Sequence, residues 1–505
     1  MLLLSLLLVP LLSAVLIGAW PGLVKPCLNR IALSLAVIPV LLVGVIGFHG
    51  GASWSLPWLP DAGIHLSFHA DGTSWMFLLL TSLITLFSMV VSAKLNIGDR
   101  AYFALMLVME SMLFGVFTAT HFIPWFLCWE MTLIPAYLLI RLWGGRNASR
   151  AARRFFIITL AGGVCMLLGF LALQLSVGTM DFALLGKLAA QKELAASLGK
   201  TFAITGLGGH ALLTTVAVSV LLGLAVKIPI VPFHAWLPDA YAEAPTPITM
   251  LLTGLLSKMG VYGLLRVFLP LFPEVFATLA PWLVGLSVAT VLLGAVAALA
   301  QKDLKRILAY SSVNHLGYCV LAVAAVVTSQ TDRVAMASAI SGLVLQAFNH
   351  GIIASAMFFG IGILESRSGG LRGLKDFGGL RARMPVFAGL LGITMFASLG
   401  LPGLSGFVGE FLIFNGAFGL VPWAAAISVI GLLLTAVFFL RIIRKVFHGP
   451  LGDNASKWTD LTATERWIFA PAIALIVMLG FFPHLLLQII NSDTLRLIEL
   501  LSPIP

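Results

Sequence analysis

Residues 223–240 read GLAVKIPIVPFHAWLPDA, and this stretch decides the fold. Lys227 ends a long apolar run and is followed almost at once by Pro229 and Pro232. A proline removes an intrahelical hydrogen bond, and a charge at the centre of a bilayer costs about 2.5–3.5 kcal/mol. Irregular backbone at membrane depth is tolerated only where it is buried in protein or lines a hydrated cavity. The stretch therefore predicts a broken membrane helix that carries a charge.

The composition of the whole chain is that of an integral membrane protein. Of its 505 residues, 60% are hydrophobic and only 10% are charged, whereas a soluble domain has about 25% charged residues. This excludes a soluble enzyme, a disordered chain and a disulfide-stapled secreted domain. The four cysteines are far apart and form no CxxC or CxxCH motif, so the sequence offers no ligand set for an iron–sulfur cluster or a c-type haem.

The lengths of the apolar runs predict about 14 transmembrane helices, the first of them a true span rather than a cleaved signal peptide. They lie at roughly 2–20, 31–48, 73–93, 102–119, 121–140, 155–176, 211–232, 246–268, 279–299, 304–327, 334–362, 385–416, 422–440 and 467–489. The connecting loops are short. We therefore expect a single membrane domain without a soluble catalytic module.

The basic residues are distributed very unevenly between the two sets of alternate loops. One set holds 22 Lys and Arg residues and the other holds 6, while Lys227 and Lys258 lie inside spans. Cytoplasmic loops carry the excess of Lys and Arg, so both termini are expected outside. The net charge of +10 is thus explained by topology, and no nucleic-acid partner is expected.

Several ionisable residues lie inside the predicted spans, where the cost of burying a charge must be offset by an interaction or serve a function. They are Glu110, Glu130, Lys227, Lys258, His315, His350 and Glu410. They could form structural ion pairs, or they could form a proton relay, because burial shifts the affinity of such groups for protons. A carboxylate and an ammonium that share one site, Glu130 with Lys227, would make a switchable pair. A haem ligated by His315 and His350, or a purely structural subunit, remains an alternative.

The span that contains Glu410 is also interrupted, by Gly400, Pro402, Gly403 and Gly406 within GLPGLSGFVGEF. It lies five spans after the broken span of Lys227, so the two cross the membrane in opposite directions. Interrupted helices at equivalent positions of two halves are typical of inverted-repeat transporters. The predicted fold is an all-α polytopic membrane protein with two inverted five-helix repeats, each with a broken helix.

The helices divide into four segments within this membrane domain. The predicted order is 1–100 for N-terminal helices 1–3, 101–270 for the first repeat with helices 4–8, 271–445 for the second repeat with helices 9–13, and 446–505 for helix 14.

The runs VKIPIVPFHAWLPDAYAEAPT, SKMGVYGLLR and QKDLKRILAYSSVNHLGY resemble the core of the antiporter-like subunits that respiratory complex I shares with Mrp-type cation/proton antiporters. The resemblance extends from about residue 68 onward. Glu410 resembles the M-subunit branch (mitochondrial subunit 4 type) of NADH–quinone oxidoreductase, since L and N subunits and most Mrp antiporters have Lys there. The chain ends about 16 residues after its last span, so we expect no long lateral helix of the L type.

The resemblance assigns roles by matching position. Glu130 and Lys227 would be the proton-loading pair, Lys258, His315 and His350 the central hydrophilic axis, and Glu410 the exit residue. It implies no cofactor on this chain, with FMN, iron–sulfur clusters and quinone in partner subunits. It also implies L-type and N-type neighbours, small membrane subunits and a bacterial cytoplasmic (inner) membrane. His121 stands where the family often has Asp, so the outer entrance is expected to differ.

The expected function is therefore proton translocation as the antiporter-like subunit of a complex I-type NADH:quinone oxidoreductase, with the redox chemistry on other chains. The alternative is a subunit of an Mrp-type antiporter or of a membrane-bound hydrogenase-like energy-converting complex. These assemblies share the motifs and differ mainly in their partners.

Overall fold

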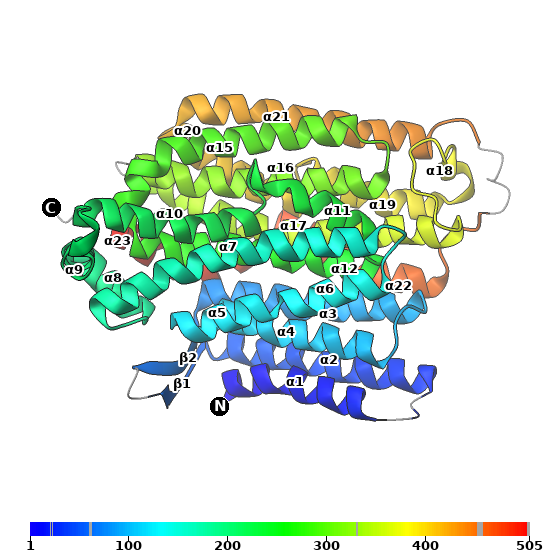
Figure 1. Ribbon diagram of the computed structural model, residues 1–505. Coiled ribbons are helices and arrows are strands. Elements are labelled where there is room, and N and C mark those ends of the chain that lie inside the picture. Colours follow the sequence, from blue (N-terminus) through cyan, green and yellow to red (C-terminus); the bar gives the residue numbers. More distant parts are fainter. Residues whose placement is uncertain (21, 23, 60–62, 330–331, 452–457, 502–505) are drawn as a thin grey trace.

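The computed structural model describes residues 1–505 except 21, 23, 60–62, 330–331, 452–457 and 502–505; the last two of these gaps fall in the predicted C-terminal segment, 446–505. The long helices lie side by side with roughly parallel axes (Figure 1). Both termini lie at the same end of this bundle, here called the terminus end. The connections that carry most of the Lys and Arg residues lie at the opposite end, here called the basic end. Termini on one side agree with an even number of crossings.

The N-terminal region contains four long helices and a two-stranded antiparallel hairpin. Its elements are α1 (Leu2–Ala19), α2 (Lys25–Phe48), β1 (Ala52–Leu59), β2 (Ile64–Ala70), α3 (Gly72–Lys94) and α4 (Arg100–Thr118). Helix α1 packs against α4, where the Ser111 hydroxyl donates to the Leu7 carbonyl at 2.6 Å. This contact makes α1 an integral part of the bundle.

The next region contains the first broken span and a helix with two π-helical turns, η4 and η5. Its elements are α5 (Phe122–Met131), α6 (Leu133–Trp143), α7 (Ala148–Val177), α8 (Phe182–Ala190), α9 (Glu193–Thr201), η2 (Ala203–Thr205), α10 (Gly209–Lys227), η3 (Phe233–Trp236), α11 (Leu237–Glu243), α12 (Thr246–Leu251), η4 (Leu252–Leu256), α13 (Ser257–Gly263), η5 (Leu264–Phe268) and α14 (Leu269–Leu271). The elements from α12 to α14 form one membrane-length helix.

The last region contains the second broken span and an amphipathic helix, α23. Its elements are α15 (Pro273–Ala300), α16 (Leu304–Thr328), α17 (Arg333–Arg367), α18 (Leu380–Arg383), α19 (Pro385–Ser398), α20 (Ser405–Leu420), α21 (Pro422–Ile442), η6 (Ile443–Phe447), α22 (Ala463–Phe481) and α23 (His484–Leu501).

The predicted number of spans is confirmed. Within the described residues, thirteen helices are long and apolar enough to cross a membrane. The predicted span 385–416 is formed by two shorter apolar helices, α19 and α20, which together supply the further crossing. The chain is thus a helical, multi-pass membrane protein.

Both predicted breaks are present. Each leaves a backbone carbonyl near a side-chain nitrogen, Val226 near the Trp236 indole and Ser398 near His315 Nε2. Helix α10 ends at Lys227, where Pro229 and Pro232 lack the N–H that would continue the helix, and the Trp236 indole donates to the Val226 carbonyl at 2.9 Å. Helix α19 ends at Ser398, before a turn in which Gly400 and Gly403 adopt φ of +71° and +90°. Such angles favour glycine because it has no Cβ.

The helices that carry the predicted central residues are shielded from lipid. The most apolar windows of Thr246–Leu271 and Arg333–Arg367 are 100% buried within the bundle, whereas that of α2 is only 28% buried. Ionisable groups on the shielded helices can therefore contact each other without contacting hydrocarbon.

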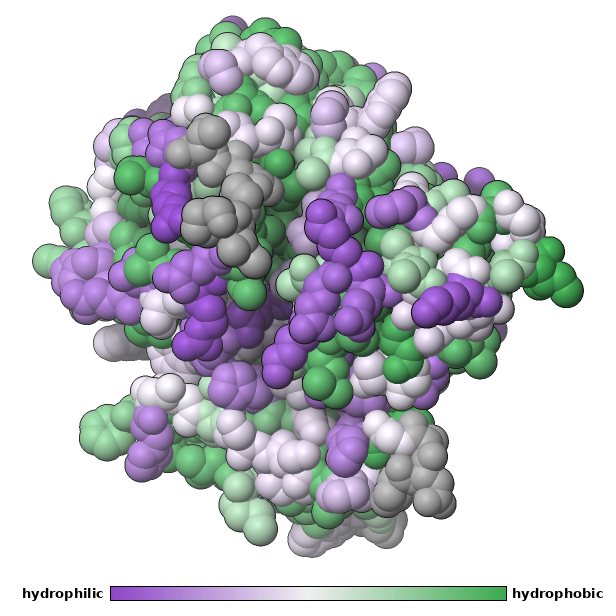
Figure 2. All heavy atoms as spheres, turned by 90° about the vertical axis from the view of Figure 1, so that its left-hand side faces the viewer, coloured by the Kyte–Doolittle hydropathy of each residue, from purple (hydrophilic) through white to green (hydrophobic). Residues whose placement is uncertain are grey.

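The terminus end carries structure that apolar run length does not predict. The hairpin pairs Ser53 with His69 and Trp54 with Phe68, so one face is polar and the other aromatic. Helices α8, α9 and α23 also lie at this end (Figure 1). Figure 2, which looks onto this end, shows hydrophilic side chains gathered across the middle of the face, as expected for a surface in contact with water.

Candidate functional site: a buried row of ionisable side chains

Glu130 and Lys227 come from α5 and α10 and lie close enough to interact electrostatically. No hydrogen bond or ion pair joins them, and within the described residues neither carboxylate oxygen of Glu130 nor Nζ of Lys227 has a hydrogen-bond partner. The Lys227 ammonium lies 5.4 Å from the centre of the Trp129 ring. A desolvated cation gains about 2 kcal/mol from such a ring. The predicted pair thus exists as a buried Lys227 and a half-buried Glu130, which lie near each other but are not in contact.

Glycines bring the three helices of this pair together. Gly162 of α7 packs against Val226 of α10, and Gly223 packs against the Gly162 carbonyl. Gly163 lies against the Glu130 carboxylate, where an added Cβ would collide with Oε1. Small residues at helix contacts let membrane helices approach closely. The sequence therefore places the Glu130 carboxylate against α7 backbone, which fixes its distance from α10.

The other four predicted residues form a continuous row across α13, α17, α16 and α20. Lys258 Nζ lies 2.8 Å from His350 Nδ1, and the rings of His350 and His315 have centroids 5.1 Å apart. His315 Nε2 lies 3.3 Å from Glu410 Oε1. All four side chains are buried. Residues up to 152 positions apart in the chain thus meet in a single line.

The neighbouring carbonyls fix where protons sit in this row. A carbonyl oxygen only accepts hydrogen bonds. His315 Nδ1 lies 2.7 Å from the Ser311 carbonyl, and its Nε2 faces both the Ser398 carbonyl at 3.2 Å and Glu410. The arrangement therefore suits a proton on each ring nitrogen, that is, a His315 imidazolium that faces the Glu410 carboxylate.

The opposite end of the row has a different proton arrangement. The Lys258 ammonium donates to the Thr253 carbonyl at 2.5 Å and to His350 Nδ1. His350 is then the neutral acceptor between two cations, Lys258 and His315. A proton transferred from Lys258 to His350 would shift the charge along the row without any large movement of the helices.

Polar atoms without a protein partner gather around this row. Among the described residues they include Asn314 Oδ1, Asn349 Oδ1, Gln346 Oε1, Tyr318 Oη and Glu410 Oε2. Buried polar atoms are nearly always hydrogen-bonded, to ordered water where protein offers no partner. The surroundings of Glu410 and the two histidines are therefore polar enough to hold water.

No hydrogen bond joins the pair of Glu130 and Lys227 to the row that begins at Lys258 in the described part of the chain. Gly260, on the helix of Lys258, packs directly against Ile228 and the Leu224 carbonyl of the Lys227 region. Tight apolar packing thus separates the two lysines. The sequence predicted one relay, and the structure arranges its members as a pair and a row.

A network of ion pairs at the basic end links the first broken span to the second half. Lys305, only 2% exposed at the start of α16, pairs with Glu365 of α17 at 2.8 Å and donates to the Ala244 carbonyl just after α11. Arg306 pairs with Asp239 of α11 at 2.9 Å. Sequence reasoning counted these basic residues only as topology signals. Their pairing was missed because the partners are about 60 residues apart.

Two further residues singled out in the sequence lie apart from both groups. Glu110 of α4 is buried, and neither carboxylate oxygen has a partner among the described residues. His121 caps the N-terminus of α5 by accepting from the Ile123 N–H. Burial lowers the pKa of His121, and the nearby Asp181 only partly opposes this effect. His121 therefore favours its neutral form.

The haem alternative does not fit the geometry. The His315 and His350 rings are too close for a porphyrin between them, and His315 donates from both nitrogens. The described residues contain no group of three or more His, Cys, Asp or Glu side chains that could hold a metal ion.

Comparison with known proteins matches residues 119–435, which include every residue of the pair and the row, to the family model described as NADH:quinone oxidoreductase/Mrp antiporter, transmembrane. The chain belongs to this family. It is 34% identical to NADH-quinone oxidoreductase subunit M of Rhodobacter capsulatus over 438 residues, which are 86% of this chain and 83% of that one. It is 32% identical to F(420)H(2) dehydrogenase subunit M of Methanosarcina mazei, covering 92% of each.

Comparison with a solved structure also supports membership of this family. Over the full length of both chains, the fold matches a chain of respiratory complex I from Thermus thermophilus with a TM-score of 0.85 and 28% identity. The predicted resemblance to antiporter-like subunits, and to their M-subunit branch, is thus confirmed. So is the predicted fold class.

Proposed function

We propose that this chain is the proton-translocating, M-type membrane subunit of a complex I-type NADH:quinone oxidoreductase in the bacterial inner membrane. The observation that carries the proposal is the buried row from Lys258 through His350 and His315 to Glu410, held on helices shielded from lipid. The similarity to the Rhodobacter subunit supports the choice of complex.

In this proposal, Glu130 and Lys227 load the proton. When Glu130 approaches, its charge keeps the Lys227 ammonium protonated, and when it withdraws, the desolvated ammonium tends to release its proton. The separation of the two groups in the structure is consistent with such a switch. Gly163 sets the position from which the carboxylate moves.

The row then carries the charge toward Glu410, which we propose as the exit residue. His350 accepts a proton from Lys258, His315 passes one to Glu410, and the polar surroundings of Glu410 connect it to water. The movement of one charge against 100 mV needs about 2.3 kcal/mol. A pKa shift of about two units at one residue of the row would supply that amount.

We propose the two halves as 101–270 and 271–445, flanked by 1–100 and 446–505. Each half then contains one broken span, α10 with its continuation in the first and α19–α20 in the second. The network of Lys305 and Arg306 joins the two halves at the basic end. A shift of α11 would therefore reach the helices that carry the histidines.

The redox cofactors belong to other subunits in this proposal, namely FMN, iron–sulfur clusters and quinone. Relatives named for NADH and for F(420)H(2) align over most of this chain, which supports an electron-donor site outside it. The neighbours would be L-type and N-type antiporter-like subunits and small membrane subunits.

Purification of the tagged chain in mild detergent tests the proposed assembly. We expect a large complex that contains flavin and iron–sulfur clusters and oxidises NADH. A small assembly of antiporter-like chains alone, or one with a nickel–iron hydrogenase, would overturn the proposed enzyme and leave the proton path to be tested separately.

Substitution tests the path itself. Glu130→Gln and Lys227→Ala should each abolish most NADH-driven proton pumping in membrane vesicles, while the complex still assembles. Normal pumping in both variants would exclude this pair as the loading site.

A further inference from the structure

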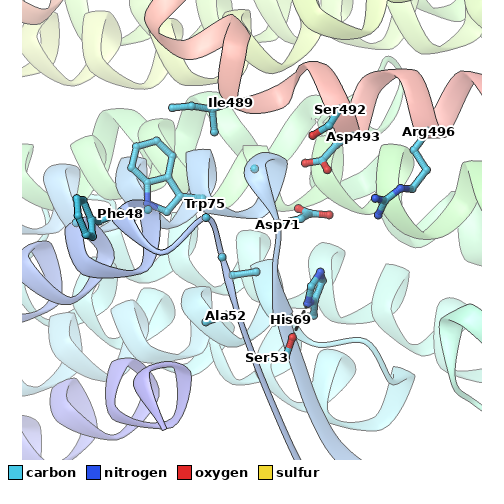
Figure 3. A pocket seen from close by; sticks show the side chains of 16 residues that line it. Phe48, Ala52, Ser53, His69, Asp71, Trp75, Ile489, Ser492, Asp493 and Arg496 are labelled. Atoms are coloured by element: carbon cyan, nitrogen blue, oxygen red, sulfur yellow. Dashed lines mark hydrogen bonds between the residues drawn. The ribbon is translucent and has the colours of Figure 1, made fainter.

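A cavity of about 880 Å³ opens at the terminus end, between the last turns of α2, the hairpin, the start of α3 and α23. Its two ends differ in chemistry, as Figure 3 shows. Asp71, Asp493, Arg496 and His69 face one another at the polar end, while Phe48, Trp75 and Ile489 lie toward the other. The cavity is therefore amphipathic, and the function proposed above does not use it.

The polar end presents one free cation and two carboxylates. Asp71 is paired with Arg266. Asp493 accepts from the Thr73 N–H at 2.7 Å. Arg496 is exposed and, within the residues that the structure describes, forms no ion pair. The guanidinium can therefore bind a phosphate, whereas the carboxylates of Asp71 and Asp493 hold negative charge beside it.

The carboxylate of Asp71 stays ionised. Burial raises its pKa, but the Arg266 guanidinium and the Ser74 N–H outweigh this effect and hold the pKa below its usual range. A ligand with a second negative charge would be repelled here. A ligand that carries an ammonium beside its phosphate would be attracted by the carboxylates through its ammonium and by Arg496 through its phosphate.

The apolar end continues into the lipid-facing surface of α2. Leu41, Val45 and Phe48 lie one turn apart on this helix and are 63%, 42% and 89% exposed. Gly44 lines the cavity, and a Cβ added there would meet nothing within 4 Å. The Trp75 ring lies against Gly47 and donates to the Val43 carbonyl at 2.8 Å. An acyl chain can follow this stripe from the bilayer into the cavity.

We propose that this cavity binds one zwitterionic phospholipid whose headgroup has a phosphate and a primary ammonium, as in phosphatidylethanolamine. Arg496 holds the phosphate, Asp71 and Asp493 face the ammonium, and an acyl chain lies along α2 beside Trp75. A soluble phosphate would satisfy Arg496 alone and leave the apolar end open. The lipid would join α2 and the hairpin to α23, three elements that otherwise meet around a cavity.

The test uses the purified membrane complex, stripped of lipid in detergent. Phosphatidylethanolamine, phosphatidylglycerol and inorganic phosphate are added separately, and thermal stability and bound lipid per complex are measured, the latter by native mass spectrometry. We expect phosphatidylethanolamine to stabilise the complex and to remain bound at one copy per chain. The Arg496→Gln variant should weaken its apparent affinity at least tenfold. Arg333→Gln, at another exposed arginine outside the cavity, is the matched control.

A second variant, on α2, tests the cavity independently of any effect of Arg496→Gln on the folding of α23. Gly44→Leu should fill the apolar end without a clash and reduce lipid binding, while Gly285→Leu, at an exposed glycine of α15 with equally open space, should not. Equal effects of inorganic phosphate and phosphatidylethanolamine would show a phosphate site and overturn the proposal. So would equal effects of the two lipids, or unchanged lipid binding in both cavity variants.

Discussion

Replacement of Glu410 by glutamine is the most informative single change, because it removes the charge beside His315 while keeping the side-chain shape. Glu410→Gln leaves an amide oxygen that can still accept from His315 Nε2. Only the ionic part of the contact is lost. The variant therefore asks whether the exit of the row needs a charge or only a hydrogen bond.

The structure gives the size of that ionic part. His315 Nε2 and Glu410 Oε1 are 3.3 Å apart, and at an effective dielectric constant of about 20 two opposite charges at this distance attract by about 5 kcal/mol. This is about twice the 2.3 kcal/mol needed to move a charge against 100 mV. Without it, the proton on His315 is no longer held against the membrane potential. We expect pumping to fall more than tenfold, since 1.36 kcal/mol already changes an equilibrium tenfold.

The assay compares proton uptake with electron transfer in the same inverted membrane vesicles. A dye sensitive to the pH gradient reports pumping, and NADH oxidation in the presence of an uncoupler reports assembly and redox activity. Glu499→Gln, which removes an exposed carboxylate on α23, serves as the control and should pump normally. Wild-type pumping per NADH oxidised in the Glu410→Gln vesicles would refute the role assigned to the ion pair.

Three other predictions follow from contacts described above. Gly163→Ala should push the Glu130 carboxylate away and lower pumping at least severalfold without loss of assembly; pumping equal to wild type would contradict the tight packing. Lys305→Gln removes the ion pair between a buried lysine and the half-buried Glu365 and should cost about 2 kcal/mol, seen as a lower Tm that Glu365→Gln in the same chain partly restores. Because burial lowers the pKa of His121, its contribution to stability is complete above about pH 6.5 and is lost as the pH falls below it. His121→Asn keeps the helix cap and should flatten the fall in Tm between pH 7 and 5, whereas an unchanged slope would exclude His121 as its source.

The buried ionisable residues could be predicted because a charge within an apolar run is visible in sequence at once. Their mutual contacts could not, since Lys258 and His350 lie 92 positions apart and nothing in their local sequence encodes a distance. The resemblance to a family supplied the order of the row. The network around Lys305 was not found because its residues lie at the ends of the spans, where Lys and Arg were counted only as signals of topology.

The elements at the terminus end were missed for a different reason. The length of an uninterrupted apolar stretch detects only helices that are apolar on all sides. Helix α23 instead buries one face, which carries Leu486, Ile490, Leu497 and Ile498. A search for the helical period of 3.6 would have found it. The hairpin did carry a signal, a Pro-Asp-Ala-Gly run at 60–63 between two alternating segments, which a search by the length of apolar runs does not detect. Residues 60–62 lie outside the described residues.

The π-helical turn η4 gives Lys258 a mechanical role as well as a chemical one. A π turn is wider than an α turn and is a weak point in a helix. The Lys258 ammonium donates to the Thr253 carbonyl inside that turn. Loss of the proton from Lys258 removes part of this support, so the shape of the helix and its charge change together. In the proposed relay, the proton occupancy of Lys258 is therefore coupled to the local geometry of its own helix.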